Sequence, residues 1–101
     1  MKMIAKKNFN QMHCRIIKRE LKLMKDLNHP FIIKMHYSFY TEESYFFVMD
    51  FCPGKDLFTL IGGGTGLGLG DACFYFAEIL KGLEYMHAKG IIYRDLKLEN
   101  V

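Results

Sequence analysis

Apolar residues recur every three or four positions in two stretches of the chain, and this spacing predicts two amphipathic helices. The first runs from about Asn10 to Leu27, with apolar residues on one arc and basic residues on the opposite one. Its apolar arc consists of Met12, Ile16, Ile17, Leu21, Leu23, Met24 and Leu27. The second runs from Asp71, a predicted N-cap, to Lys89, with Gly90 as its C-terminal stop. Its main apolar face consists of Ala72, Phe76, Ile79, Leu80, Leu83 and Met86.

Between these helices the pattern changes to that of strands. Asn28-His29-Pro30 ends the first helix, and apolar residues then alternate with polar ones from Phe31 to Phe39. This alternation predicts a strand with one buried face. Residues 45–49 are continuously apolar, as expected of a strand covered on both faces. A polar turn joins the two into a predicted β-hairpin, and residues 1–5 form a short strand-like piece.

Two polar residues fall on apolar helix faces. Glu20 lies in the middle of the first apolar arc, and burying its carboxylate unpaired would cost several kcal/mol. It must therefore pair with a cation or extend its head to the edge of the face. His87 lies on the second apolar face, where we expect a packed core histidine. Phe74 and Tyr85 point away from that face, so this helix needs burial on two sides and the chain looks cut short.

Residues 62–70 contain six glycines in nine positions. They include neither G-x-G-x-x-G nor G-K-[ST], and they do not directly follow a strand. The tract therefore predicts a flexible linker and not a phosphate-binding loop. Just before it, Asp56 can N-cap a short helix from Leu57 to Ile61.

Composition narrows the class of protein. The length of 101 residues predicts one domain, and a net charge of +3 is too small to indicate a nucleic-acid partner. Cys14, Cys52 and Cys73 are odd in number and form no C-x-x-C pair, which predicts free thiols in a reducing compartment. The N-terminus has no apolar leader and no apolar run reaches transmembrane length. We therefore expect a cytoplasmic or nuclear protein without a membrane segment.

The stretch from Tyr93 to Asn100 carries the clearest chemistry in the chain. It places a carboxylate at Asp95, an ammonium two residues on at Lys97 and a carboxamide five residues on at Asn100. Phosphoryl transfer to a hydroxyl needs a carboxylate that accepts the proton, a cation that neutralises the phosphoryl charge and an oxygen that holds Mg²⁺. The alternative interpretation is a charged turn after a helix.

This stretch resembles the catalytic loop of eukaryotic protein kinases, H-R-D-L-x-x-x-N, with Tyr93 at the position of the histidine. Met1-Lys2-Met3-Ile4 matches the end of the family's V-A-I-K strand, whose lysine contacts the ATP phosphates and pairs with a helical glutamate. Glu20 matches that glutamate. The resemblance thus makes Lys2 the cation that Glu20 requires.

The stretch from Gly90 to Lys97 resembles in particular the kinase A-, B- and C-like families of the AGC group of Ser/Thr kinases. Three further segments also resemble the AGC group. They are Asn28-His29-Pro30-Phe31, His36-Tyr37-Ser38-Phe39 and Phe47-Val48-Met49-Asp50-Phe51. The resemblance implies that Met49 is the gatekeeper and that the backbone at Asp50 and Cys52 meets adenine. It also implies that Asp56 lies near the ribose and that Lys97 marks Ser/Thr specificity.

The fold implied by the resemblance is α+β, a partial protein-kinase fold truncated at both ends. It assigns residues 1–49 to part of the N-lobe and 50–61 to the hinge and a short helix. Residues 62–70 would be the glycine-rich linker and 71–101 the start of the C-lobe. The family's glycine-rich loop, D-F-G aspartate and activation loop have no counterpart in the sequence, and Lys55 replaces a usual glycine.

The implied function is transfer of the γ-phosphate of ATP to Ser or Thr hydroxyls, with ATP and Mg²⁺ as cofactors. Asp95 would be the base, Lys97 would stabilise the phosphoryl group and Asn100 would bind Mg²⁺. Lys2, held by Glu20, would grip the phosphates. The implied partners are protein substrates with basic residues near the target, and an upstream activating kinase.

Two alternatives stay open. The chain could be a catalytically dead kinase piece that acts only in binding or as a scaffold, or a basic adaptor that uses the face from Arg15 to Lys25. In either kinase interpretation we expect these 101 residues by themselves to be inactive, to bind Mg²⁺-ATP weakly and to be poorly soluble or molten.

Overall fold

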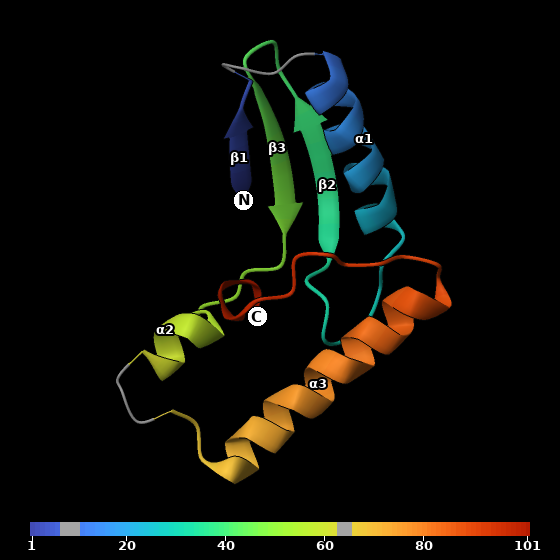
Figure 1. Cartoon of the computed structure of the whole chain (residues 1–101). Helices are drawn as coiled ribbons and strands as arrows, with labels where there is room; N and C mark the ends of the chain where they lie inside the picture. The colour runs from blue at the N-terminus through green and yellow to red at the C-terminus, as the bar shows by residue number, and fades with distance from the viewer. Residues whose placement is uncertain (7–10, 63–65) are drawn as a thin grey trace. The chain divides into compact units, whose positions relative to one another are not determined.

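The computed structural model describes residues 1–6, 11–62 and 66–101 (Figure 1). These residues form two compact units, Met1–Phe51 and Cys52–Val101, and each is described by itself. The predicted start of the first helix at Asn10 and the middle of the predicted glycine linker, residues 63–65, lie outside the described residues. No helix among the described residues is both long and apolar enough to span a membrane.

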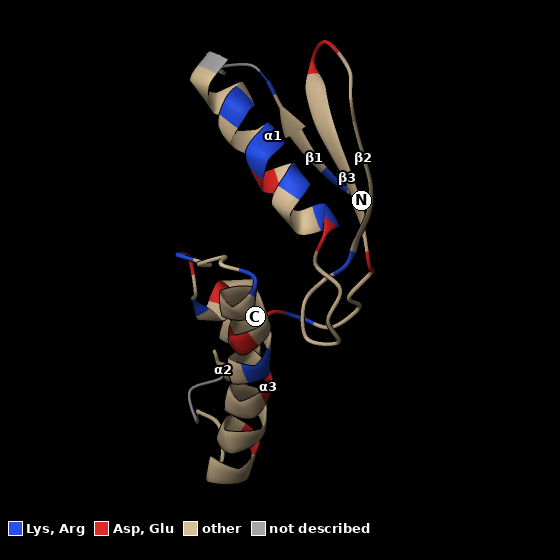
Figure 2. Ribbon diagram, turned by 90° about the vertical axis from the view of Figure 1, so that its right-hand side faces the viewer, with Lys and Arg blue, Asp and Glu red and all other residues tan. Residues whose placement is uncertain are grey.

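The first unit is a three-stranded antiparallel sheet with one helix packed on it (Figure 1). Its strands are β1 (Lys2–Ala5), β2 (Met35–Tyr40) and β3 (Ser44–Met49), in the order β1-β3-β2. The helix α1 (Gln11–Lys25) packs against β2, and its basic residues lie on its exposed side (Figure 2). The predicted helix and hairpin are confirmed.

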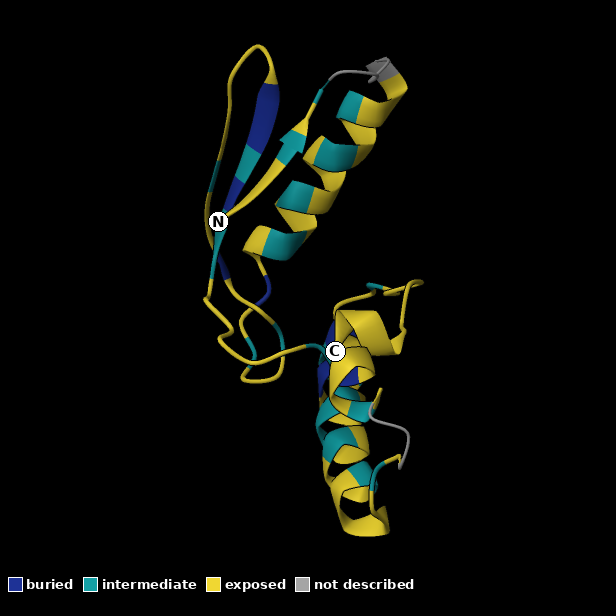
Figure 3. Ribbon diagram, turned by 90° about the vertical axis from the view of Figure 1, so that its left-hand side faces the viewer, coloured by how far each residue is buried: buried dark blue, intermediate teal, exposed yellow. Residues whose placement is uncertain are grey.

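The core of this unit lies between α1 and one face of the sheet. Met35, Tyr45 and Phe47 are buried there. Partly buried residues surround them: Ile4, Cys14, Ile17, Leu21, Met24 and Met49. The four core residues of α1 are spaced as one narrow stripe of a helix, visible as partly buried patches in Figure 3.

The predicted apolar arc of α1 is wider than the face that packs. Met12, Ile16 and Leu23 are 70%, 48% and 41% exposed. Glu20 lies between this exposed apolar strip and the buried stripe and is itself exposed. The side chain of Glu20 is therefore accessible to water and is not buried in the core.

The predicted single buried face of the strand from Phe31 to Phe39 is wrong. Regular pairing begins only at Met35, and a bulge shifts the register between Met35 and Tyr37. An extra residue at a bulge moves the following side chains to the opposite face of the sheet. Met35 is therefore buried, whereas Tyr37 and Phe39 lie on the other face and are 70% and 51% exposed.

The second unit contains two helices and one short 3-10 turn. The predicted helix α2 (Leu57–Ile61) is confirmed, and Asp56 is its N-cap: Oδ1 accepts bonds from the amide and the hydroxyl of Thr59 at 2.7 and 2.8 Å. The helix α3 (Leu69–Ala88) begins before the predicted cap at Asp71, and Gly68 is its N-cap. Asp71 lies instead in the first turn, where its negative charge interacts favourably with the positive end of the helix dipole.

The prediction that His87 is a packed core histidine is wrong, because His87 is exposed. Gly82 and Met86 are the buried residues of α3. Phe74, which points away from the main apolar face, is 60% exposed. Tyr85 is half-buried, and the Lys89 ammonium lies 5.2 Å from its ring centre. The fully buried residues of α3 thus lie in its C-terminal half.

We expect Phe47→Ala to lower the free energy of unfolding by about 3 kcal/mol, because it removes a buried ring from the sheet core. Phe47 is 7% exposed and Phe51 is 86% exposed, so Phe51→Ala is the matched control and should change it by less than about 0.5 kcal/mol. Urea unfolding of the gene product that contains this chain, followed by circular dichroism, measures both. Equal losses in the two variants would contradict the assigned core.

Candidate active site

The predicted catalytic loop leaves α3 through a left-handed glycine. Gly90 has φ 72°, its amide donates to the carbonyl of His87 at 2.9 Å, and the amide of Ile91 donates to that of Met86 at 2.9 Å. A positive φ favours glycine because it has no Cβ, so the predicted stop at Gly90 is confirmed. Residues 91–97 that follow have no regular secondary structure.

A second set of bonds holds the far end of the loop. The 3-10 turn η1 (Leu98–Asn100) follows it, and the amide of Asn100 donates to the carbonyl of Lys97 at 2.9 Å. The carbonyl of Val101 accepts from the amide of Leu57 at 2.8 Å, which joins the end of the chain to the first turn of α2. The loop is therefore fixed at both ends within this unit.

Asp95 is the centre of the polar contacts in the loop. The ammonium of Lys97 lies 3.1 Å from its Oδ1, and the Nδ2 of Asn100 donates to its Oδ2 at 2.9 Å. The same Nδ2 donates to the backbone carbonyl of Asp95 at 2.9 Å. The structure thus brings together Asp95, Lys97 and Asn100, the three residues predicted to be catalytic.

The charges in the loop favour an ionised Asp95. Its pKa lies below the ordinary value of 3.8, first because Lys97 and then because Asn100 donate hydrogen bonds to it. In return, the pKa of Lys97 is raised by its bond to Asp95. Burial raises the pKa of Tyr93, which stays a neutral phenol at neutral pH. Asp95 is therefore an acceptor, with a cation beside it.

Arg94, which directly precedes Asp95, has a left-handed backbone with φ 65°. Among the described residues, Arg94 is the only non-glycine residue with a positive φ. Such a conformation costs of order 1 kcal/mol in a residue with a Cβ and concentrates at functional sites. No sequence pattern marks this strained backbone in advance.

The donor set fits a magnesium ion that arrives with a nucleotide. Among the described residues, no group of three or more His, Cys, Asp and Glu could hold a metal by itself. Asn100 uses its Nδ2 on Asp95, so its remaining polar side-chain atom is the carboxamide oxygen. Mg²⁺ is commonly held by one or two protein oxygens together with substrate phosphates.

The first unit contains the residues predicted to contact the phosphates. Lys2 pairs with Phe47, so it lies on the sheet face that α1 covers. Both Lys2 and Glu20 are exposed. In the described part of the chain the ion pairs join other residues, namely His36 and Asp50, Lys81 and Glu84, and Asp95 and Lys97. The pairing of Lys2 with Glu20 stays a prediction.

The residues predicted to contact adenine and ribose follow the end of β3. Met49 is the last residue of β3 and packs against the core, and Asp50 comes directly after it. Cys52 is exposed, and Asp56 is occupied as the cap of α2. Sequence reasoning missed His36, whose ring nitrogen contacts Asp50, because only the bulge brings that ring to it.

A groove in the first unit contains none of the predicted site residues. It has a volume of about 340 Å³ and lies between α1 and the strands β2 and β3. Its lining consists of Lys18, Leu21, Lys22, Lys25, Ser38, Phe39, Tyr40 and Tyr45. This lining contains no carboxylate and no carboxamide, so the groove lacks the proton acceptor and the metal ligand that phosphoryl transfer needs.

We predict that Lys97→Met raises the pKa of Asp95 toward 3.8, because it removes the largest cause of the lowered value. In the wild type the contacts of Asp95 stabilise the loop above pH 3.8 and are lost as the pH falls through the lowered pKa. NMR titration of the Asp95 carboxyl carbon measures this, with Lys89→Met as the control. A wild-type carboxyl that titrates at or above 3.8 would contradict the geometry.

Comparisons with known proteins identify the family to which the chain belongs. The family model described as protein kinase domain matches residues 1–101. Ribosomal protein S6 kinase alpha-1 of Mus musculus is 45% identical over 84 residues, which are 83% of this chain and 12% of that protein. Ribosomal protein S6 kinase alpha-2 of Homo sapiens is 44% identical over 84 residues, again 83% of this chain and 12% of that protein.

The crystal structure of Rad53 1-466 in complex with AMP-PNP superposes with a TM-score of 0.82 at 32% identity. The superposed region covers 97% of this chain and 25% of the Rad53 chain. The chain thus spans a small part of the proteins that it matches. The sheet, the helices and this superposition confirm the predicted α+β fold, a partial protein-kinase fold. The chain belongs to the protein kinase domain family.

Proposed function

We propose that this chain is part of a serine/threonine protein kinase of the AGC group, which transfers the γ-phosphate of ATP to Ser or Thr hydroxyls. The observation that carries the proposal is the arrangement of Asp95, whose two carboxylate oxygens contact Lys97 and Asn100. The similarity to the S6 kinases, named for a protein substrate, supports the activity and the group.

In this proposal Asp95 orients the substrate hydroxyl and accepts its proton. The lowered pKa of Asp95 keeps it ionised at neutral pH, so it can accept a hydrogen bond from the hydroxyl. Lys97, 3.1 Å from Asp95, can neutralise negative charge on the phosphoryl group as it moves. Mg²⁺ bound to ATP supplies charge neutralisation at the phosphates, and Asn100 would hold it through its carboxamide oxygen.

On the nucleotide side, Lys2 contacts the phosphates and Glu20 orients Lys2. Met49 is the gatekeeper, the backbone of Asp50 and Cys52 meets adenine, and Asp56 lies near the ribose. The Rad53 structure contains AMP-PNP, an ATP analogue, which supports ATP as the cofactor. The position of Lys2 on the α1 side of the sheet supports its pairing with Glu20.

The partners in this proposal are protein substrates with basic residues near the target and an upstream kinase. Glu99 is exposed and can pair with a substrate arginine, and Arg94 can receive a phosphate. Cys14, Cys52 and Cys73 are free, which supports a cytoplasmic or nuclear location.

The test of the proposed function is Asp95→Asn in the gene product that contains this chain. Loss of the proton acceptor should lower the turnover of a basic serine peptide by about 100-fold or more. Asp71→Asn, an exposed residue in the first turn of α3, is the control and should keep full turnover. Transfer of labelled phosphate from ATP measures both.

A wild-type product that binds a kinase but transfers no phosphate would favour the alternative of a binding or scaffold piece. Turnover by Asp95→Asn at the wild-type rate would contradict the role of Asp95.

A second prediction concerns the orientation of Lys2. We expect Glu20→Ala to lower turnover by about 100-fold, because small displacements of a group that positions the phosphates are costly to the rate. Stability should change by less than about 0.5 kcal/mol, since Glu20 is exposed. Glu42→Ala, in the exposed turn between β2 and β3, is the control. Activity within a few-fold of the wild type would show that Glu20 does not hold Lys2.

A further inference from the structure

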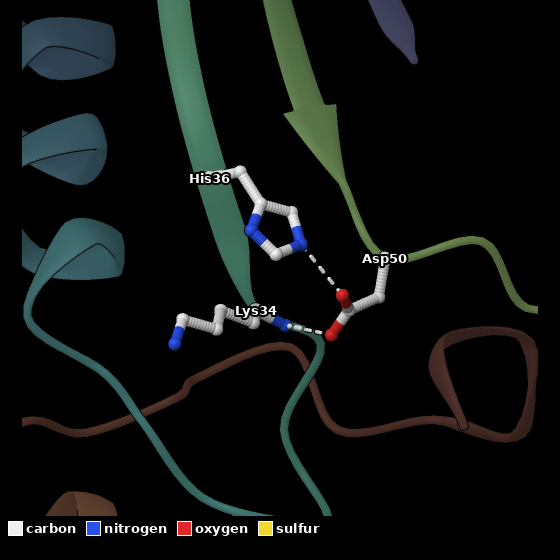
Figure 4. Close-up of polar contacts among 3 residues, drawn as sticks. All are labelled: Lys34, His36 and Asp50. Atoms are coloured by element: carbon white, nitrogen blue, oxygen red, sulfur yellow. Dashed lines mark hydrogen bonds and ion pairs between the residues drawn. The ribbon is translucent and has the colours of Figure 1, made fainter.

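The bulge in β2 places His36 beside the end of β3, where the chain leaves the sheet. Met35 pairs with Met49 and Tyr37 pairs with Val48, so His36 is the extra residue between them. Its Nε2 lies 2.7 Å from Oδ1 of Asp50, the residue that follows β3 (Figure 4). A strand without the bulge would continue the ladder here and would direct the ring elsewhere.

Asp50 is held by its side chain and by its backbone. The amide of Lys34 donates to Oδ2 of Asp50 at 3.1 Å (Figure 4). The amide of Asp50 donates in turn to the carbonyl of Lys34 at 3.0 Å. We call these three residues, Lys34, His36 and Asp50, the Asp50 clamp. Both carboxylate oxygens and the backbone amide of Asp50 are thus engaged by the segment that enters β2.

The Asp50 clamp acts at a point where regular structure ends. After Met49 no helix or strand begins until Leu57, so no ladder or helix fixes the direction of the chain across residues 50–56. The bond from His36, followed by that from the Lys34 amide, lowers the pKa of Asp50, so its carboxylate accepts both bonds at neutral pH. The clamp thereby orients the first residue of the connecting segment.

We propose that His36 is a positioning residue for nucleotide binding, acting through the Asp50 carboxylate to fix the backbone that meets adenine. This inference rests on the proposed function, which assigns the backbone of Asp50 and Cys52 to that contact. Hydrogen bonds from a backbone to a base are directional, so a segment that can rotate binds the base less well. His36 itself touches no nucleotide in this account.

The kinetic test replaces His36 by leucine, which lacks the donor, and by glutamine, which keeps an N–H donor. One hydrogen bond to a carboxylate changes an equilibrium constant by about tenfold. We therefore expect His36→Leu to raise the KM for ATP by about five- to tenfold, with kcat within about twofold. His36→Gln should restore most of the affinity, and the exposed His87→Leu is the control, with no change.

An unchanged KM for ATP in His36→Leu would overturn the inference. So would an equal loss of kcat in the leucine and glutamine variants, because it would indicate a general structural defect and not a lost donor.

Amide hydrogen exchange in the same proteins separates this inference from the proposed function. Loss of the clamp should weaken the protection of the Lys34 and Asp50 amides in His36→Leu, and His36→Gln should retain it. Unchanged protection in His36→Leu overturns the inference alone. A wild-type protein that neither binds nor hydrolyses ATP, while His36→Leu still loses protection of the Lys34 and Asp50 amides, overturns the proposed function and with it the nucleotide role of the clamp.

Discussion

The pairing of β3 on both of its edges is the constraint on which the first unit depends. Because β1 and β2 flank it, Tyr45 and Phe47 are held on one face and buried under α1. The same pairing positions two residues of the predicted nucleotide site, one at the phosphates and one at adenine. Lys2 is opposite Phe47, and Asp50 follows the last residue of β3. A hydrophobic core thus positions polar residues that contribute little to that core themselves.

The second unit holds its chemical groups by a different means. The loop of residues 91–97 has no ladder of backbone bonds, so polar side chains organise it. Asn100 bonds both to the carbonyl and to the carboxylate of Asp95, and Lys97 balances the charge. The groups proposed for catalysis therefore also maintain the loop. A change to Lys97 or Asn100 alters the electrostatics of Asp95 as well as removing its own contact.

Local sequence patterns predicted most helices and strands, whereas contacts between these elements determine the bulge and which side chains are buried. The cap at Asp56, the helix of residues 57–61 and the stop at Gly90 depend on neighbours in sequence and are confirmed. The bulge at His36 arises from pairing with β3, which periodicity within one strand cannot show. His87 fits an apolar face by spacing, yet no described element covers it. The offsets of Asp95, Lys97 and Asn100 predicted a cluster, but not the strained Arg94 beside it.

The central claim is that Asp95, Lys97 and Asn100 form a phosphoryl-transfer site that binds magnesium with its nucleotide. The most direct test is a crystal structure of the gene product with Mg²⁺ and a non-hydrolysable ATP analogue. We expect a magnesium ion about 2.1 Å from the carboxamide oxygen of Asn100, with the terminal phosphate facing Asp95 and Lys97. A nucleotide bound with its metal remote from Asn100, or its terminal phosphate turned away from Asp95, would contradict it.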